Sequence, residues 1–520
     1  MNLIGLILIN NSSLNIKVKF GVLFLFCLIS CLSFGYPFKI MHVITLFLIM
    51  LTVSSFSSFL YKLLIAIIFI ISSFYLPVAL SFGPVDFNTL LSVKYSNVSE
   101  GIMLIKTIPG FYFSLPLVTL AMTIFIFDIK VDKLNFRPII ITYLFISLVS
   151  TPVRLYINEG RVKVFSTGIP VVRFVTDVLE NYRQVDEETA LMQQSLTTPD
   201  VWAPERTLTN YQNYIIIIGE SVRSDYLNAY GFPIGNTPFM SSAPGVLFTH
   251  YISAASSTQT SLKNSLSLRR GLYVELNNNI ITLANKAGFT TFWYSNQGSL
   301  GPHDTSVSSF AKRANLFNFM QKGKSSDGVG SGDFDLLGGV ASVMKKNKPA
   351  KLIVLHLMGS HPLACDRTKG KYQEFSQSKE ISCYIQSIRE TDELLSRVVE
   401  LAKESGQSWS MMYFADHGLA FKGPDTDNAR LQHGDKLKQN YTVPMFMTSS
   451  DSKRREVNSY PRSAINFLSL FAQWTGIKDK LIGTGCNMLA DVPCDNQDRV
   501  IQFTQEQVLF SSLGEDTPAH

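Results

Sequence analysis

The stretch that decides the fold is SMMYFADH, residues 410–417, in which an apolar run ends in Asp416 and His417. A second apolar run, residues 214–218, is followed by Gly219, Glu220 and Ser221. Short apolar runs are typical of buried strands, and open α/β sheets assemble their sites at the carboxyl ends of such strands. Carboxylate oxygens and an imidazole nitrogen suit a catalytic zinc ion that keeps one coordination position open. We therefore predict a metal-dependent enzyme.

Strand and helix patterns alternate through residues 209–520, which we predict to form the catalytic domain. Strands are predicted at 213–219, 290–295, 351–358, 409–415 and 443–448, and an amphipathic helix at 381–405. Such alternation is typical of a mostly parallel sheet covered by helices. The length of this region suits one large α/β domain rather than several small ones.

The first 157 residues are predicted to form a transmembrane domain of five helices. Apolar stretches lie at 20–35, 41–60, 63–82, 112–127 and 137–156, each near the ~20 residues that a helix needs to cross a bilayer. The stretch 63–82 is apolar on all sides and lacks the polar stripe of a soluble core helix. The first stretch has no convincing cleavage site and is followed by four more, so we expect it to be retained.

The charges that flank these stretches predict their orientation. In an alternating topology one side receives Lys17, Lys19, Lys62, Lys130, Lys133 and Arg137, and the other receives Lys39, Lys94 and Lys106. Because cytoplasmic loops are enriched in Lys and Arg, the N-terminus is expected in the cytoplasm and the catalytic domain in the periplasm of a bacterial inner membrane. The net charge of +6 is modest and forms no basic stripe, so nucleic acid is not an expected partner.

A connector, residues 158–208, is predicted between the two domains. Residues 171–179 have the apolar spacing of a helix that lies on a membrane surface or on the next domain. A polar stretch and then Pro199 and Pro204 follow, which is the composition of a domain boundary.

The cysteines agree with an external location of the second half. Cys27 and Cys31 lie within the first apolar stretch, where a thiol behaves as a small apolar group. The remaining four, Cys365, Cys383, Cys486 and Cys494, lie in polar sequence, and an oxidising compartment would pair them. Proximity favours Cys365 with Cys383 and Cys486 with Cys494, although four cysteines allow three connectivities.

Short motifs occur in a fixed order along the second half of the chain. They are IGESVRSD (218–225), NTP (236–238), STQTS (257–261), SNQ (295–297), HLMGSH (356–361) and ADHG (415–418). Their order and spacing resemble the bacterial inner-membrane phosphoethanolamine transferases, whose catalytic domain has the alkaline phosphatase/sulfatase fold. Five spans before that domain also match, so the resemblance covers nearly the whole chain. Within the family, STQ-x-S and HLMGSHP are most similar to the enzymes that modify osmoregulated periplasmic glucans.

The resemblance implies a zinc site whose ligands are Glu220, Asp416, His417 and a nucleophilic threonine, with a second zinc ion as an option. A hydroxyl becomes a competent nucleophile at neutral pH when a metal holds it near its alkoxide form. Thr258 matches the family pattern through Ser261, whereas Thr260 fits a looser pattern. We choose Thr258; the competing interpretation is that this Ser/Thr-rich run only caps a helix.

Further side chains are expected around the phosphate. By resemblance, His361 and His433 occupy the places of phosphate-binding or second-zinc histidines, although a lone loop histidine is often simply solvated. Asn296 and Gln297 end a predicted strand and could donate to phosphate oxygens or to the headgroup; for Gln297 a simple turn position is equally acceptable. We expect His356, within an apolar strand, to be a hydrogen-bonded core histidine.

A short external loop is the last candidate for substrate binding. Ser96, Asn97 and Glu100 lie between the third and fourth apolar stretches and resemble a family segment beneath the catalytic pocket. There a carboxylate would pair with the ethanolamine ammonium. An ordinary interfacial loop is the competing interpretation. The tail after Val492 matches no family element, and residues 514–520 are expected to be disordered.

The resemblance implies transfer of phosphoethanolamine from phosphatidylethanolamine to a periplasmic glycan, with an osmoregulated glucan as the favoured acceptor. Lipid A and lipopolysaccharide core are alternative acceptors. A glycerol-phosphate transferase would share the spans and the threonine, and an inactive membrane sensor or scaffold is the non-enzyme alternative. A sulfatase is disfavoured because residues 257–262 lack the x-Pro-x-Arg that follows its nucleophile. We expect a monomer.

Overall fold

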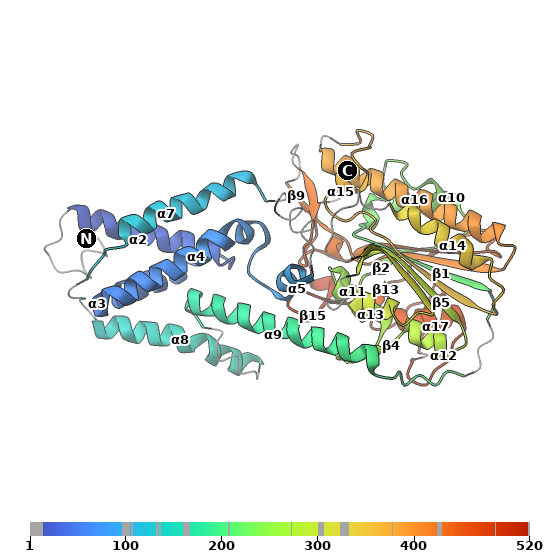
Figure 1. Ribbon diagram of the computed structural model, residues 1–520, viewed down its shortest axis with the longest axis horizontal. Coiled ribbons are helices and arrows are strands. Elements are labelled where there is room, and N and C mark those ends of the chain that lie inside the picture. Colours follow the sequence, from blue (N-terminus) through green and yellow to red (C-terminus); the bar gives the residue numbers. More distant parts are fainter. Residues whose placement is uncertain are drawn as a thin grey trace. The chain divides into compact units, whose positions relative to one another are not determined.

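The computed structural model describes residues 14–517 except 96–104, 106–107, 132–133, 135–136, 160–166, 206–208, 272, 300–305, 323–331, 377, 424–428 and 484. The chain divides into two compact units, Met1–Asp186 and Glu187–His520. Figure 1 shows their helices and strands, and the division falls within helix α9, Pro170–Thr197.

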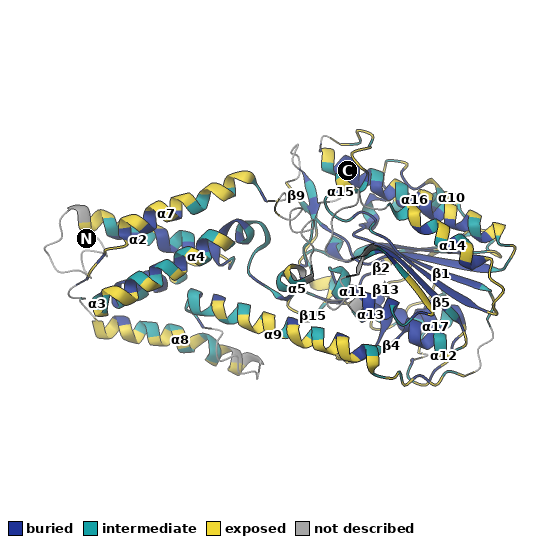
Figure 2. Cartoon of the chain, in the orientation of Figure 1, coloured by how far each residue is buried: buried dark blue, intermediate teal, exposed yellow. Residues whose placement is uncertain are grey.

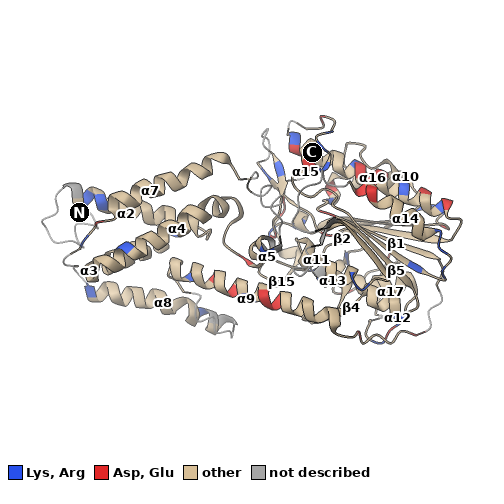
Figure 3. Cartoon of the chain, viewed as in Figure 1, with Lys and Arg blue, Asp and Glu red and all other residues tan. Residues whose placement is uncertain are grey.

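The first unit is helical. Its described helices are α2 (Leu14–Ser33), α3 (Ile40–Phe56), α4 (Ser58–Phe82), α5 (Phe87–Tyr95), α7 (Leu115–Ile126) and α8 (Arg137–Glu159), along which charged residues are sparse (Figure 3). Helices therefore cover all five predicted apolar stretches. Among the described residues, two segments, Ile16–Ser33 and Ser58–Phe82, are long and apolar enough to cross a membrane, and two apolar helices, Ile40–Phe56 and Gly110–Ile126, are shorter.

Hydrogen bonds inside the first unit pair some of its buried polar groups. The hydroxyl of Tyr61 in α4 donates to the carbonyl of Ile126 in α7 at 2.8 Å. Ser33 in α2 and Ser72 in α4 share a hydrogen bond of 2.9 Å. Because an unpaired polar group in an apolar interior is costly, these bonds favour one packing of the helices.

The second unit is built on one large sheet. In sheet order its strands are β12 (Arg455–Asn458), β2 (Gly245–Ile252), β11 (Thr442–Ser449), β8 (Trp409–Ala415), β1 (Asn213–Gly219), β7 (Lys351–His356), β5 (Thr290–Ser299) and β6 (Leu316–Lys322), and β13 (Arg462–Ser463) also pairs with β2. Only β11 runs antiparallel to its neighbours in this sheet. The predicted mostly parallel sheet is confirmed with all five predicted strands, whereas β2, β6, β12 and β13 were not predicted.

Helices cover both faces of the sheet. One face carries α10 (Pro238–Ser242), α14 (Leu337–Met344) and α16 (Lys379–Glu404), and the other carries α11 (Thr258–Leu266), α12 (Ile280–Lys286), α13 (Ser306–Ala311) and α17 (Phe467–Thr475) (Figure 1). Every residue of β1, β7 and β8 is buried, as Figure 2 shows for the centre of the sheet. This burial explains why these strands are continuous apolar runs.

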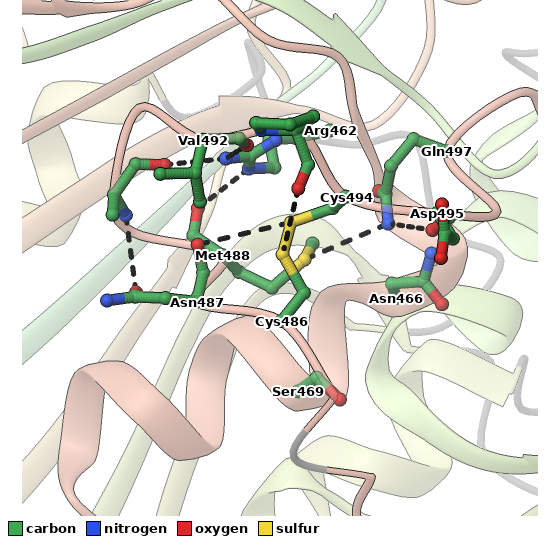
Figure 4. The surroundings of a disulfide bond; sticks show 12 residues. Arg462, Asn466, Ser469, Cys486, Asn487, Met488, Val492, Cys494, Asp495 and Gln497 are labelled. Atoms are coloured by element: carbon green, nitrogen blue, oxygen red, sulfur yellow. Dashed lines mark hydrogen bonds between the residues drawn. A yellow bond between two sulfur atoms is a disulfide. The ribbon is translucent and has the colours of Figure 1, made fainter.

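Two disulfides join the cysteines of the second unit. Cys365 pairs with Cys383, and Cys486 with Cys494, so the pairing by proximity is confirmed. Cys27 and Cys31 are free and buried. Beside the second disulfide lies the buried guanidinium of Arg462, which donates to backbone carbonyls of the same loop (Figure 4).

The end of the chain corrects an expectation. Residues 514–517 were expected to be disordered, but Asp516 forms an ion pair with Arg223 at 2.8 Å, and the exposed fractions of the two side chains are 6% and 0%. The expectation was wrong because the partner lies 293 residues earlier, a distance that no local sequence pattern can bridge. Residues 518–520 lie outside the described part of the chain.

Candidate active site

The candidate metal ligands follow two adjacent parallel strands. Gly219 at the end of β1 lies opposite Ala415 at the end of β8. Glu220 and the pair Asp416-His417 therefore emerge at the same edge of the sheet. All three are at most 1% exposed, and one ligand atom from each lies within 4.8 Å of the others.

Thr258 lies against this group. It is the first residue of α11, and its half-buried hydroxyl donates to Glu220 Oε2 at 2.9 Å. The Thr258 hydroxyl oxygen also lies 3.4 Å from His417 Nε2. Three residues later, the Ser261 hydroxyl donates to the carbonyl of Asp416 at 2.6 Å, which holds the start of α11 on the end of β8.

The charges of the group are arranged for a cation. Burial and the neighbouring Glu220 raise the pKa of Asp416 to about 7. Burial alone would lower the pKa of His417, but Asp416 and Glu220 raise it to about 9. Burial opposes ionisation of Glu220 as well, yet its hydrogen bond to His417 and the nearby imidazoles hold its pKa well below the usual value. Two buried carboxylates beside an imidazole thus need a positive charge between them.

Hydrogen bonding supports the fit of a metal ion. Asp416 Oδ1 accepts from two backbone N–H groups, those of Ser221 at 3.0 Å and His417 at 2.7 Å, whereas the buried Oδ2 atom has no hydrogen-bond partner. His417 Nδ1 lies 2.8 Å from the carbonyl of Gly418, which can only accept, so Nδ1 carries a proton and Nε2 is the nitrogen that could bind a metal ion once it loses its own proton. A carboxylate oxygen without a donor, a second carboxylate, an imidazole nitrogen and a hydroxyl form a suitable donor set for a divalent cation.

The loop after β1 has a conformation that aims Glu220 at the group. Ser221 has a positive φ of 61°, unusual for a residue other than glycine, and its hydroxyl donates to Glu220 Oε1 at 2.5 Å. Gly359, after β7, approaches Glu220 so closely that an added Cβ would lie 3.0 Å from the Glu220 nitrogen. Backbone strain and close approach of this kind are common at functional sites.

The structure brings His361 and His433 to the same place. The His433 ring lies 5.2 Å from the His417 ring and 5.8 Å from the His361 ring, centre to centre. Both outer histidines are partly exposed. Burial and the other imidazoles lower the pKa of His433 to about 3, and burial lowers the pKa of His361, so in the metal-free site both rings are neutral at pH 7.

Gln297 and Asn296 have different partners. The Gln297 amide donates to Glu220 Oε2 at 2.9 Å and to the carbonyl of Leu357 at 3.0 Å, so it lies in the site and holds the carboxylate. The Asn296 amide instead donates to Asp333 at 2.7 Å. The Asp333 carboxylate also accepts from the backbone N–H groups of Met358 and Gly359, each at 2.9 Å. Asn296 therefore helps to hold the loop after β7.

Two expectations meet different outcomes. His356 is a buried core histidine as expected, and its Nδ1 lies 3.2 Å from the Ser295 hydroxyl. The expected hydrogen bonding is only half complete, because its Nε2 atom has no hydrogen-bond partner. Burial lowers the pKa of His356 to about 4, which keeps the ring neutral. Ser96, Asn97 and Glu100 lie outside the described residues.

Several supporting residues escaped sequence reasoning. The Tyr384 hydroxyl, on α16, donates to the carbonyl of Ser221 at 2.8 Å and accepts from the Arg223 N–H at 2.9 Å. Asp333 and Tyr384 stand in no motif, and only the fold brings them to the site. Ser221 and Arg223 could have been noticed because they lie beside Glu220 in the IGESVRSD motif.

Comparison with known proteins agrees with this geometry. The Sulfatase family matches residues 212–477. Phosphoethanolamine transferase OpgE of Escherichia coli (strain K12) is 36% identical, and the alignment covers 95% of this chain and 94% of the relative. Phosphoethanolamine transferase EptC of the same strain is 19% identical over 54% of this chain and 52% of the relative.

Two solved structures share the fold. The integral membrane protein lipooligosaccharide phosphoethanolamine transferase A (EptA) from Neisseria meningitidis is 15% identical with a TM-score of 0.59, covering 89% of this chain and 97% of that one. The C-terminal periplasmic domain of EptC from Escherichia coli, solved as a complex with Zn, is 17% identical with a TM-score of 0.51, covering 61% of this chain and 97% of that one. Together with the near full-length similarity to OpgE, the sulfatase match establishes that the chain belongs to the phosphoethanolamine transferases of the sulfatase family.

Proposed function

We propose that the protein transfers phosphoethanolamine from phosphatidylethanolamine to a periplasmic glycan through a covalent intermediate on Thr258. The observation that carries this proposal is the 2.9 Å hydrogen bond from the Thr258 hydroxyl to Glu220 within the buried group of Asp416 and His417. A half-buried hydroxyl beside buried acids and an imidazole is placed to act as a nucleophile. The family to which the chain belongs supports the same chemistry.

In the first half-reaction, the Thr258 oxygen attacks the phosphorus of the lipid. A bond forms between Thr258 Oγ1 and phosphorus, the bond from phosphorus to the diacylglycerol oxygen breaks, and diacylglycerol leaves with a proton. In the second half-reaction an acceptor hydroxyl attacks the same phosphorus, its proton is removed, and Thr258 recovers its hydroxyl. The covalent intermediate thus divides one difficult transfer into two easier steps.

Zinc is the metal we propose for Glu220, Asp416, His417 and Thr258. When bound, it would lower the pKa of the threonine hydroxyl and offset negative charge at the phosphate. The Asp416 Oδ2 atom, which has no hydrogen-bond partner, and His417 Nε2, whose ring is oriented by the Nδ1 contact with the Gly418 carbonyl, are the atoms on this chain that support such binding. The Zn complex of the EptC domain, which shares the fold, supports the choice of zinc.

His361 and His433 are proposed to serve the phosphate. As neutral rings near His417 they can donate an N–H to a phosphate oxygen or pass a proton to the leaving oxygen. Gln297 is proposed to orient Glu220, which it contacts at 2.9 Å. For Ser96, Asn97 and Glu100 we keep the proposal that they help to hold the ethanolamine headgroup.

We further propose that all five apolar segments cross a bacterial inner membrane, with the catalytic domain in the periplasm and the connector 158–208 between them. The Lys and Arg bias of the flanking residues supports this orientation. The two disulfides support it as well, because such bonds persist in an oxidising compartment. A donor in the membrane would then lie on the same side as the catalytic domain.

The acceptor we propose is an osmoregulated periplasmic glucan, because the STQTS and HLMGSHP runs resemble the enzymes that modify it. Lipid A and lipopolysaccharide core are the competing acceptors. Mass spectrometry of periplasmic glucans and of lipid A, from cells with and without the protein, tests this choice. Phosphoethanolamine that depends on the protein is expected on the glucans; its appearance only on lipid A would overturn the proposed acceptor.

A further inference from the structure

The C-terminal segment, residues 499–517, contacts four loops around the candidate site. It forms β14 (Arg499–Ile501) and β15 (Gln507–Leu509), which pair with each other, and then a turn of 3-10 helix, Phe510–Ser512. The Ile501 N–H donates to the carbonyl of Ala254 at 2.9 Å, and Ile501 forms an isolated bridge with Ala255. Ala254 and Ala255 lie four and three residues before Thr258, the proposed nucleophile.

The same segment holds the loop of His433. The Phe503 N–H donates to Asp435 Oδ2 at 2.9 Å, and the Gln502 amide donates to the Asp435 carbonyl at 3.1 Å. Further along, Gly514 exchanges backbone hydrogen bonds with Lys436 at 3.1 Å and with Lys438 at 2.8 Å. Residues 435–438 are thus hydrogen-bonded both to residues 502–503, near the start of the C-terminal segment, and to Gly514, near its end.

An apolar contact anchors the C-terminal segment to the sheet. Val500 is fully buried and packs in one cluster with Ile252, at the end of β2, and Tyr441, just before β11; partly buried Val508, Phe510 and Leu513 pack against this cluster. Burial of apolar side chains supplies a non-directional attraction, and the hydrogen bonds then set the register.

The last contact joins the two loops that carry the metal ligands. Asp516 Oδ2 accepts from Arg223 Nη1 at 2.8 Å and from the Phe421 N–H at 2.6 Å. Arg223 lies three residues after Glu220, and Phe421 lies four residues after His417. Arg223 Nη2 also donates to the carbonyl of Thr517 at 3.0 Å, and its side chain is fully buried. One carboxylate oxygen therefore bridges the loop after β1 and the loop after β8.

We propose that Asp516 is a positioning residue for the transferase site, acting through Arg223 and the Phe421 backbone to fix the distance between Glu220 and the pair Asp416-His417. This inference rests on the proposed function for its effect on transfer, and on the donor geometry alone for its effect on metal binding. Groups that orient metal ligands from outside contribute to metal affinity and to rate without touching the substrate. The end of the chain is thereby part of the site's architecture.

The test compares Asp516→Asn and Asp516→Glu with a matched control in the full-length protein in detergent. The control is Glu456→Gln, which breaks an exposed acid–arginine pair with Arg454. For Asp516→Asn we expect Zn²⁺ affinity to fall about 10–100-fold and kcat for transfer from phosphatidylethanolamine to fall roughly tenfold or more, with KM changed less than about twofold. Asp516→Glu should recover part of the Zn²⁺ affinity and part of kcat. Glu456→Gln should match the wild type in both quantities.

A double variant separates positioning from general stability. If Asp516 acts through Arg223, then Asp516→Asn combined with Arg223→Gln should lose little more kcat and Zn²⁺ affinity than Arg223→Gln alone, because coupled residues are not additive. Additive losses, or wild-type Zn²⁺ affinity and kcat in folded Asp516→Asn, would overturn the inference. A wild type that binds Zn²⁺ but performs no transfer would instead overturn the proposed function, and Zn²⁺ affinity would still test Asp516.

A milder variant keeps the test informative if Asp516→Asn does not fold. Gln502→Ala removes one hydrogen bond to the His433 loop and leaves no buried charge unpaired. We expect kcat to fall about two- to fivefold, the equivalent of one net hydrogen bond, with the thermal midpoint nearly unchanged. An unchanged kcat in this variant would argue that the C-terminal segment only stabilises the fold.

Discussion

Two buried polar centres in the second unit differ in whether their polar atoms are satisfied. The acidic centre consists of Glu220, Asp416 and His417, and the arginine centre consists of Arg462 and the carbonyls that it binds. Arg462 is fully buried, and its three nitrogens donate to the carbonyls of Pro461, Met488, Ala490 and Val492 at 2.6–2.9 Å. The acidic centre is equally buried, yet Asp416 Oδ2 has no donor.

The difference leads us to propose that the arginine centre stabilises the fold and that the acidic centre binds a ligand. A buried polar group with all its hydrogen bonds is compatible with a purely structural role. A buried carboxylate with a missing donor and a raised pKa is destabilising on its own, so its presence calls for a ligand. Variants of the two centres should therefore separate activity from stability in opposite ways.

The largest effect is expected for Thr258→Ala, which removes the proposed nucleophile beside the acidic centre. Transfer should fall by at least about 10³-fold, because alanine has no hydroxyl that could attack the phosphorus and form the covalent intermediate. The thermal midpoint should stay close to that of the wild type, since this hydroxyl is only half-buried. Thr258→Ser, which retains a hydroxyl, is the control and should keep measurable activity. Wild-type turnover by the Ala variant would transfer the role to Thr260.

Metal removal should expose the repulsion in the acidic centre. Because burial and Glu220 raise the pKa of Asp416 from 3.8 to about 7 in the folded protein, stability is lost as pH rises from about 4 to about 7. His417, raised to about 9, contributes stability below its unfolded pKa that is lost as pH rises through 9. Together the two changes lower the stability of chelated protein between about pH 4 and about pH 9.

Thermal unfolding of chelated and Zn²⁺-loaded protein across this pH range measures the effect. The chelated form should lose several degrees, given roughly 2–4 °C per kcal/mol for a domain of this size. The loaded form should lose much less, and Zn²⁺ should restore transfer. Equal pH profiles with and without metal would contradict a cation site at Glu220, Asp416 and His417.

The arginine centre should respond in the opposite sense. Arg462→Leu leaves buried carbonyls without donors, so unfolding free energy should fall by about 3 kcal/mol or more, given roughly 1–3 kcal/mol for each unpaired group. Turnover of the molecules that remain folded should stay near the wild type. Arg454→Leu, at a side chain that is 82% exposed, is the control and should leave the unfolding free energy close to that of the wild type. A large loss of kcat in folded Arg462→Leu would break the contrast.

A smaller effect is expected where the backbone meets Glu220. Gly359→Ala places a methyl group 3.0 Å from the Glu220 nitrogen at a φ of 45°, so stability should fall by about 1–2 kcal/mol and kcat by roughly tenfold. Gly338→Ala is the matched control, because its Cβ meets no atom within 4 Å and Ala favours helix α14 by up to about 1 kcal/mol. Loss of activity in both variants would show that the effect is not specific to Glu220.

The two centres also show how far a single sequence can be read. Glu220, Asp416 and His417 could be predicted because each follows an apolar run, and adjacent parallel strands bring such ends together. Arg462 could not be predicted, because three of its four acceptors are backbone carbonyls of residues 488–492 and no motif records them. Asp516 was missed for the same reason, since its partner Arg223 is reached only through the fold.

The covalent step is tested most directly by mass spectrometry of the peptide that contains Thr258. Purified full-length protein, loaded with Zn²⁺ and incubated with phosphatidylethanolamine in the absence of acceptor, should carry phosphoethanolamine on Thr258, and the adduct should disappear when acceptor is added. An adduct on Thr260 or on another residue, or sustained transfer with no adduct at any time, would contradict the account.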